Sequence, residues 1–101
     1  MNLGDLIKQL EEYNPDTKVP LGFGAPYSYR GDYYSVAFEP VEVTTIGEML
    51  EHAKSALGAT FTGYKGGEYT MDDWAACYIA AYGCSGETLG PILLAYMAGQ
   101  L

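Results

Sequence analysis

The sequence predicts an α+β fold, with a small antiparallel sheet of about four to five strands and two to three helices packed on it. Apolar residues recur at helical spacing in two segments, and alternating or aromatic-rich segments lie between and after them. With 101 residues, of which 49% are hydrophobic, the chain is expected to form one domain over residues 1–101. A chain of this length buries roughly 60–65% of its unfolded surface, so we expect it to fold without a metal or a disulfide.

The first predicted element is a helix over residues 3–13. Its apolar positions follow helical spacing: Leu3, Leu6, Ile7 and Leu10. The run Asn14-Pro15-Asp16 is expected to end this helix, because the residue before a proline avoids the helical conformation.

A short strand is predicted next, around Val19 and Leu21. Pro20 cannot donate a ladder hydrogen bond, so it indicates an edge position or a brief strand. Three residues that break strands follow and predict a loop: Gly22, Gly24 and Pro26. We expect this loop to carry the tyrosine and arginine cluster described below.

Residues 34–43 alternate well enough to predict a second strand, with Pro40 marking its end or a bulge. Thr44 or Thr45 then caps a second helix, because Glu48 stands where a capping box requires it. The buried stripe expected on this helix is Ile46, Met49, Leu50, Ala53 and Leu57. Gly58 is expected to close the helix in the left-handed conformation.

A β-hairpin is predicted over residues 60–71, with its turn at Lys65-Gly66-Gly67. Residues 74–82 fit either a helix or a strand by spacing, and their aromatic content favours a strand beside the hairpin. A turn at Gly83 and Gly86 follows. Residues 88–98 are also ambiguous, but Pro91 in a first turn favours a terminal helix.

The charge balance indicates which partners this chain avoids. Thirteen acidic residues against five basic ones give a formal net charge of −8, which repels DNA and RNA polymers but leaves room for a small anionic ligand in one pocket. The N-terminus lacks the basic and apolar regions of a secretory signal, and no apolar run approaches the roughly 18 residues of a membrane span. We therefore expect a cytoplasmic protein that binds neither a nucleic-acid polymer nor a membrane.

Residues 27–34 place four tyrosines around Arg30, the only arginine of the chain. Tyrosine offers a flat apolar face, and the guanidinium offers a planar fork of donors that fits a phosphate or a carboxylate. A nucleotide needs both features. An ordinary strand with a solvated Arg30 beside Asp32 explains the same residues equally well from composition alone.

The segment Gly63-Tyr64-Lys65-Gly66-Gly67 is the second candidate. Its glycines permit close approach of a ligand to the backbone, while Lys65 supplies charge and Tyr64 a stacking face. A plain hairpin turn uses the same residues and is the favoured interpretation of this segment taken alone. The ligand interpretation gains weight because the arginine and one of four lysines both lie in loops rich in glycine and tyrosine.

The sequence offers little for catalysis, so we expect a protein that is not an enzyme and that uses no cofactor or metal. The one histidine, His52, falls on the polar face of the second predicted helix, where a solvated side chain is favoured over a general base. Cys77 and Cys84 match no zinc or redox spacing and are expected to be two partly buried thiols. Motifs of serine hydrolases, zinc proteases and P-loop enzymes are absent from the sequence.

Three segments of the sequence resemble small bacteriophage proteins: residues 28–33, residues 45–50 and residues 60–71. Within that group the chain resembles the Thoeris anti-defence sponges, which sequester cyclic-ADP-ribose-type signals and, in some members, cyclic oligonucleotides. The resemblance covers most of residues 1–82. It implies an α+β protein of the host bacterial cytoplasm that forms a dimer or higher homo-oligomer and binds its ligand without cleaving it.

The resemblance also implies which residues bind the nucleotide. Arg30 matches the family's Arg-Gly turn, and Phe61, Tyr64 and Lys65 match its Gly-Tyr-Lys-Gly-Gly segment. The full predicted site is Tyr29, Arg30, Gly31, Tyr33, Phe61, Tyr64, Lys65, Gly66 and Gly67. Residues 86–91 depart from the family, because they lack a further arginine to clamp a phosphate.

One arginine per chain is few for two phosphates, so a site shared between subunits is expected to supply a second. The alternative hypothesis is a phage protein that binds a host or phage protein through its apolar C-terminal segment and its tyrosine-rich surface. Tyrosine and arginine also dominate the energetically important positions of protein interfaces.

Overall fold

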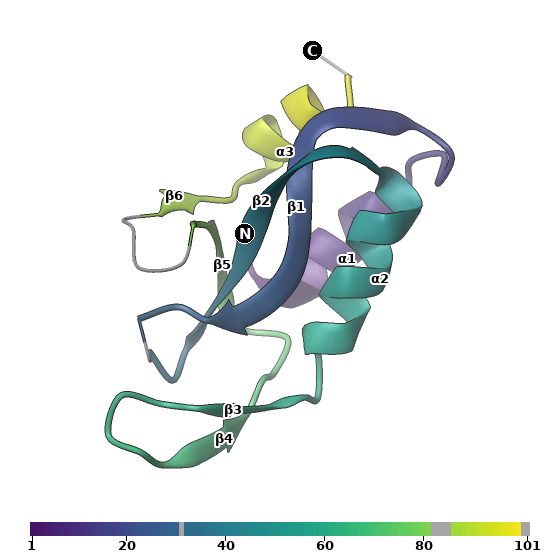
Figure 1. Cartoon of the computed structure of the whole chain (residues 1–101). Helices are drawn as coiled ribbons and strands as arrows, with labels where there is room; N and C mark the ends of the chain where they lie inside the picture. Colours follow the sequence, from purple (N-terminus) through teal and green to yellow (C-terminus); the bar gives the residue numbers. More distant parts are fainter. Residues whose placement is uncertain (31, 82–85, 100–101) are drawn as a thin grey trace.

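The computed structural model describes residues 1–30, 32–81 and 86–99, and it confirms the predicted α+β class (Figure 1). Its elements in chain order are α1 (Leu3–Glu11), β1 (Lys18–Ser28), β2 (Ser35–Thr45), α2 (Ile46–Ala56), β3 (Thr60–Thr62), β4 (Glu68–Thr70), β5 (Ala76–Ile79), β6 (Glu87–Thr88) and α3 (Pro91–Met97). Four strands form one sheet in the order β1-β2-β5-β6, and β3 and β4 form a two-stranded sheet of their own.

The larger sheet is mixed rather than wholly antiparallel. β1 pairs with β2, and β5 with β6, in the antiparallel sense, but β2 and β5 are parallel, with Ser35 opposite Ala76 and Phe38 opposite Ile79. Parallel neighbours need a long crossover between them. Here the chain from α2 through the β3–β4 hairpin provides that crossover and returns to the end of the sheet where β2 began.

β1 is much longer than predicted, and the loop expected at Gly22, Gly24 and Pro26 was wrong because the strand continues to Ser28. Gly22 is required by packing rather than by a turn. A Cβ atom at this position would lie 2.6 Å from Thr44 Cγ2 and 2.9 Å from Met49 Sδ. The missing side chain therefore lets α2 approach the sheet closely.

The β1–β2 ladder contains a bulge next to Pro40. Phe23 pairs with Pro40 and Pro26 pairs with Phe38, so two residues of β1 oppose the single residue Glu39 of β2. A bulge of this kind leaves one residue unpaired and bends the strand. The expectation of an irregularity at Pro40 is confirmed, as is the edge position of β1, which carries Pro20.

α2 begins at the expected cap, and α1 begins at a cap that was not predicted. The Asn2 side chain accepts a hydrogen bond from the Asp5 N–H (2.8 Å), and Thr45 Oγ1 accepts one from the Glu48 N–H (3.1 Å). Thr44 also contributes, because its hydroxyl donates to the Glu48 carboxylate at 2.8 Å. Such side-chain acceptors satisfy the unpaired N–H groups of a first helical turn.

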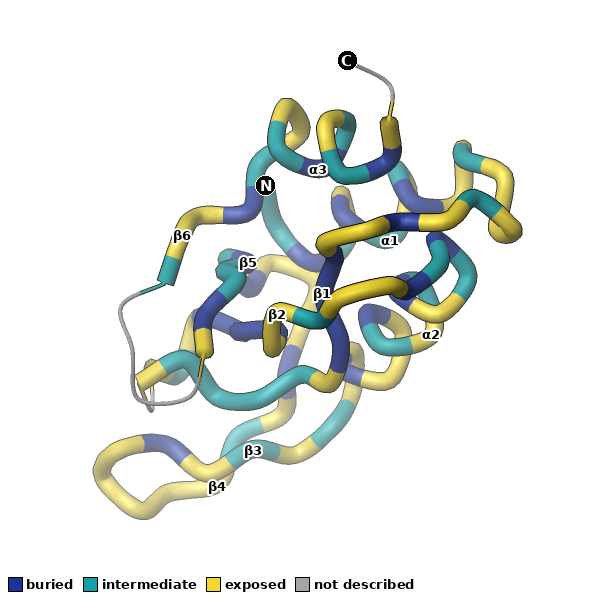
Figure 2. Tube along the Cα trace, turned by 45° about the horizontal axis from the view of Figure 1, so that its top comes forward, coloured by how far each residue is buried: buried dark blue, intermediate teal, exposed yellow. Residues whose placement is uncertain are grey.

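α1 and α2 pack against each other and against the sheet around one hydrophobic core (Figures 1 and 2). The largest fully buried side chains are Phe23, Phe38, Leu3, Leu6, Leu10, Ile46, Met49, Met71, Leu89, Leu94, Val19 and Val36. The stripe predicted on α2 differs at its end, where Ala56 is buried and Leu57 is exposed. Leu57 lies past the last helical residue, so it no longer follows the helical spacing that the prediction extended.

The β3–β4 hairpin lies at one end of the molecule and is largely exposed (Figure 2). Its turn is confirmed, since Gly66 has φ +82°, and Gly58 ends the preceding segment in the left-handed conformation with φ +81° as predicted. The two ambiguous segments adopt the favoured structures, β5 within residues 74–82 and α3 within residues 88–98. Gly83 of the predicted turn lies outside the described residues.

None of the helices in the described part of the chain has the length and apolar character needed to cross a membrane.

Candidate functional site

The two predicted loops lie side by side at one end of the molecule. Residues 29–34 connect β1 to β2, and residues 63–67 form the turn of the β3–β4 hairpin (Figure 1). They come from segments about thirty residues apart in the chain. We call the two loops together the tyrosine site.

Tyr33 is the residue that joins the two loops. Its ring centroid lies 5.8 Å from that of Tyr64 and 5.2 Å from that of Tyr69. Its hydroxyl accepts a hydrogen bond from the Lys65 N–H at 3.3 Å. The ring also lies directly on Gly63, where a Cβ atom would stand 2.2 Å from Tyr33 Cζ. The hairpin turn therefore needs a glycine at 63 because the Tyr33 ring occupies the place of its side chain.

Tyr69 fixes the connecting loop from the other side. Its hydroxyl donates to the Asp32 carbonyl at 2.9 Å and lies 3.0 Å from Ser28 Oγ. The Asp32 carboxylate in turn accepts from the Tyr34 N–H (2.9 Å) and the Ser35 hydroxyl (3.2 Å). These contacts tie Asp32, Tyr34 and Ser35 together and join them to Tyr69 of β4.

Tyr29 and Arg30 form the second half of the site. The ring of Tyr29 stacks on that of Tyr78 in β5, with centroids 4.1 Å apart and planes 11° from parallel. The Tyr29 hydroxyl accepts a hydrogen bond from the Gly86 N–H at 3.2 Å. The Arg30 guanidinium carbon lies 5.4 Å from the Tyr29 ring centroid, a cation–π distance. One tyrosine ring therefore holds the arginine and is itself held by β5.

Arg30 is exposed and has φ +53°, a left-handed conformation that is uncommon for a residue other than glycine. Unusual backbone conformations of this kind persist where surrounding contacts enforce them, and they cluster at functional sites. Gly31, which the sequence predicted as part of the site, lies outside the described residues.

Lys65 repeats the pairing of cation and tyrosine on the hairpin. Its ammonium nitrogen lies 5.5 Å from the ring centroid of Tyr64, which is 68% exposed. The backbone donors of the turn are largely used within the protein, because the Gly66 N–H donates to the Gly63 carbonyl and the Lys65 N–H to Tyr33. An anion at this turn would therefore be bound mainly by the side-chain charge rather than by a nest of N–H groups.

Phe61 differs from the other predicted site residues because it packs against the hydrophobic core. It is half-buried, packs against the core and pairs across the hairpin with Tyr69, with ring centroids 6.1 Å apart. Such cross-strand aromatic pairs stabilise two-stranded sheets. The observed role of Phe61 is to support Tyr69, and its contact with a ligand stays a prediction.

Tyr69, Tyr78 and Asp32 position the site and were not among the site residues predicted from the sequence. Tyr69 could have been found, since a turn at Lys65-Gly66-Gly67 places it opposite Phe61 on the same face of the hairpin. Tyr78 could not, because its stacking on Tyr29 depends on β5 lying beside β2.

The other groups considered for chemistry lie elsewhere. His52 is half-exposed on α2, and Cys77 is fully buried in β5, where burial raises the pKa of its thiol from 9.0 to about 12. Cys84 lies outside the described residues. Within residues 1–30, 32–81 and 86–99, no three His, Cys, Asp or Glu side chains gather closely enough to hold a metal ion.

Comparisons of the chain with protein-family models, with curated proteins and with solved structures found no match.

Proposed function

We propose that this protein binds a small cyclic nucleotide at the tyrosine site and sequesters it without cleaving it. The ligand class is the one implied by the resemblance to the Thoeris anti-defence sponges, a cyclic-ADP-ribose-type signal or a cyclic oligonucleotide. The proposed setting is the cytoplasm of a bacterium infected by the phage that encodes the protein.

The observation that carries this proposal is the contact of Tyr33 with the hairpin turn. Through it, the loop with the only arginine and the turn with Lys65 become one surface. Each of the two cations lies over a tyrosine ring, at 5.4 Å for Arg30 and 5.5 Å for Lys65. Two cations beside aromatic rings are what a base attached to a pyrophosphate requires.

Rough magnitudes support tight binding at such a surface. A base stacked on an aromatic ring gains about 1–3 kcal/mol, and a hydrogen bond to a charged group about 1.5–3 kcal/mol. The exposed ring of Tyr64 offers an open stacking face, as does the more exposed ring of Tyr34, whereas Tyr29 already stacks on Tyr78. We further propose a homo-oligomer in which two subunits contribute their arginines to one ligand.

The side chains of the site support binding rather than turnover. They supply aromatic faces and two cations, and none of them is the thiol or imidazole that usually acts as nucleophile or base at neutral pH. Cys77 is fully buried in β5, where burial moves the pKa of its thiol further above neutral pH, and His52 lies on α2, outside both loops. We therefore expect no conversion of the bound nucleotide.

The proposal is tested by incubating the protein with cyclic ADP-ribose isomers and with cyclic di- and trinucleotides. After removal of free ligand by filtration, the protein is heated and the released compounds are identified by chromatography and mass spectrometry. Recovery of an intact nucleotide is the expected result. Recovery of a cleaved product would show turnover instead, and recovery of nothing across the panel would refute the proposal.

The location of the site is tested by calorimetry with the recovered nucleotide. Arg30→Ala and Lys65→Ala are expected to weaken binding at least about tenfold each, because each removes a charge-assisted contact. Lys8→Ala is the matched control, because it removes one exposed positive charge from α1. Full affinity in Arg30→Ala, or an equal loss in Lys8→Ala, would show that the ligand binds elsewhere.

A further inference from the structure

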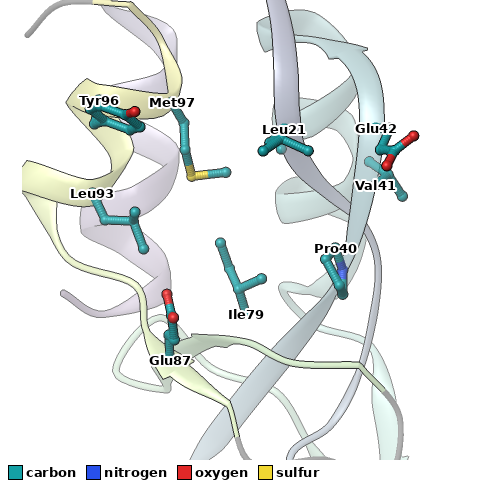
Figure 3. Close-up of a pocket in the computed structure, with 10 residues that line it drawn as sticks. Leu21, Pro40, Val41, Glu42, Ile79, Glu87, Leu93, Tyr96 and Met97 are labelled. Atoms are coloured by element: carbon teal, nitrogen blue, oxygen red, sulfur yellow. The ribbon is translucent and has the colours of Figure 1, made fainter.

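An open apolar groove lies between α3 and the β1–β2 hairpin, with Ile79 of β5 between its two walls (Figure 3). Its volume is about 490 Å³, within the range of natural binding sites. Leu21 on the strand wall is 68% exposed and Tyr96 on the helix wall is 70% exposed. Two large apolar side chains thus stand uncovered on opposite sides of one hollow.

The groove is longer than this first hollow. A second hollow of about 240 Å³ continues from it, shares Leu21, Tyr96 and Met97 with it, and reaches Lys18 at the start of β1. At the other end lies Glu87 of β6, whose carboxylate points toward the space below Leu93 (Figure 3). The long axis of the groove therefore runs from a negative end at Glu87 to a positive end at Lys18.

Neither charge is used by the described part of the chain. Within residues 1–30, 32–81 and 86–99, Lys54 forms an ion pair with Glu11. Neither the Lys18 nor the Glu87 side chain forms a hydrogen bond or an ion pair with these residues. Both are exposed. An apolar centre with an unpaired acid at one end and an unpaired base at the other fits an occupant of opposite polarity.

We propose that this groove binds a short amphipathic segment of a partner protein. Apolar side chains of the segment lie between Leu21 and Tyr96, a basic residue pairs with Glu87, and an acidic residue pairs with Lys18. Binding of apolar anchors in a groove with flanking charges is a recurring mode of peptide recognition. The inference is independent of the nucleotide proposal, because it uses no residue of the tyrosine site.

A peptide segment fits the shape better than a second copy of this chain. The groove is concave, so two copies placed face to face would leave the hollow between them unfilled, whereas a helix or strand of a partner enters it. The net charge of −8 also favours a partner segment with a basic residue and speeds its approach.

The proposal is tested by selecting from displayed random peptides of about 12 residues, which span about 18 Å when helical. Peptides are selected on the wild-type protein and depleted on Tyr96→Asp. The expected survivors share apolar anchors and at least one lysine or arginine. Their affinities are then measured by fluorescence anisotropy with free labelled peptide.

Matched variants distinguish peptide binding in the groove from nonspecific attraction of a basic peptide to an acidic protein. Leu21→Asp, Tyr96→Asp and Glu87→Lys are each expected to weaken binding about tenfold or more. Ile92→Asp is the control for Tyr96→Asp, because Ile92 is an exposed residue of the same helix outside the groove. Glu12→Lys is the control for Glu87→Lys, because it changes the net charge equally at the end of α1.

Three results would overturn the proposal. The first is failure to enrich any peptide on the wild type over Tyr96→Asp, with circular dichroism and melting showing that both proteins are folded. The second is an equal loss of affinity in a control and its partner variant. The third is self-association in sedimentation that Leu21→Asp and Tyr96→Asp abolish, which would make a second copy the occupant. Shifts of the Ile79, Leu93 and Met97 methyl resonances on adding peptide would support the proposal.

Discussion

The ring of Tyr33 lies on Gly63, so close that a Cβ atom at residue 63 would stand 2.2 Å from Tyr33 Cζ and 2.6 Å from its hydroxyl oxygen. This contact, together with the hydrogen bond from the Tyr69 hydroxyl of β4 to the Asp32 carbonyl, joins the loop after β1 to the β3–β4 hairpin, which is largely exposed and forms a sheet of its own. The position of the hairpin turn, and with it that of Lys65, therefore depends in part on a glycine and a tyrosine thirty residues apart.

Gly63→Ala is expected to destabilise the protein by about 1–3 kcal/mol, because an added methyl group must displace a packed ring. Gly67→Ala is the matched control in the same turn, since its Cβ would lie 3.6 Å from Tyr33 Oη, an ordinary contact. Urea unfolding of both variants gives the two free energies. An equal effect of the two substitutions would mean that Tyr33 does not hold the hairpin through residue 63.

Gly22→Ala is expected to cost a similar amount, because its Cβ would lie 2.6 Å from Thr44 Cγ2. Thr44→Ser removes that methyl group and keeps the hydroxyl that donates to Glu48. The double variant is therefore expected to be more stable than the sum of the two single effects predicts, as for residues in direct contact. Strict additivity in urea unfolding would place the strain of Gly22→Ala at Met49 or elsewhere.

The sequence predicted best the features that are encoded by neighbouring residues. Thr45 and Glu48 lie three apart and specify the start of α2, Pro91 specifies the first turn of α3, and Gly66 specifies the hairpin turn. In each case the side chain that decides the structure acts on backbone within a few residues of itself. Such signals are legible without knowledge of the tertiary structure.

Features that depend on distant contacts were missed. Gly22 and Gly24 predicted a loop. Gly22 is instead required by the close packing of α2, which lies more than twenty residues further along the chain. The parallel pairing of β2 with β5 follows from how the intervening chain crosses over, which no short pattern encodes. The same holds for the candidate site, where both loops were predicted but the tyrosines that position them, Tyr69 and Tyr78, were not.

The stability of the protein is expected to fall in alkaline solution through Cys77. Burial raises the pKa of this thiol from 9.0 to about 12, so between these values the unfolded chain has lost the proton that the folded chain keeps. Below pH 9.0 the thiol is protonated in both the folded and the unfolded state, and its full contribution to the free energy of unfolding is present. Between pH 9.0 and about 12 this contribution decreases by up to about 1.4 kcal/mol per pH unit.

Cys77→Ala isolates this effect, because it removes the thiol and leaves every other titratable group of the chain in place. Urea unfolding of both proteins, below pH 9.0 and inside the window, gives their difference in the free energy of unfolding. We expect the advantage of the wild type over Cys77→Ala to shrink as the pH rises. A difference that stays constant would show that the thiol ionises as easily in the folded protein as in the unfolded chain.

Tyr69→Phe is expected to loosen the loop that carries Arg30 while leaving the hairpin formed. The substitution removes the hydroxyl that donates to the Asp32 carbonyl and lies 3.0 Å from Ser28 Oγ, but it keeps the ring that packs against Tyr33 and Phe61. The expected cost in stability is about 1 kcal/mol. Amide exchange should increase at Asp32 and Tyr34, whose backbone geometry depends on this anchor, and nucleotide affinity should fall.

Tyr64→Phe is the matched control, because the Tyr64 hydroxyl has no hydrogen bond within the described residues. If Tyr69→Phe weakens nucleotide binding without changing amide exchange in the loop, Tyr69 contacts the ligand directly instead of positioning the loop.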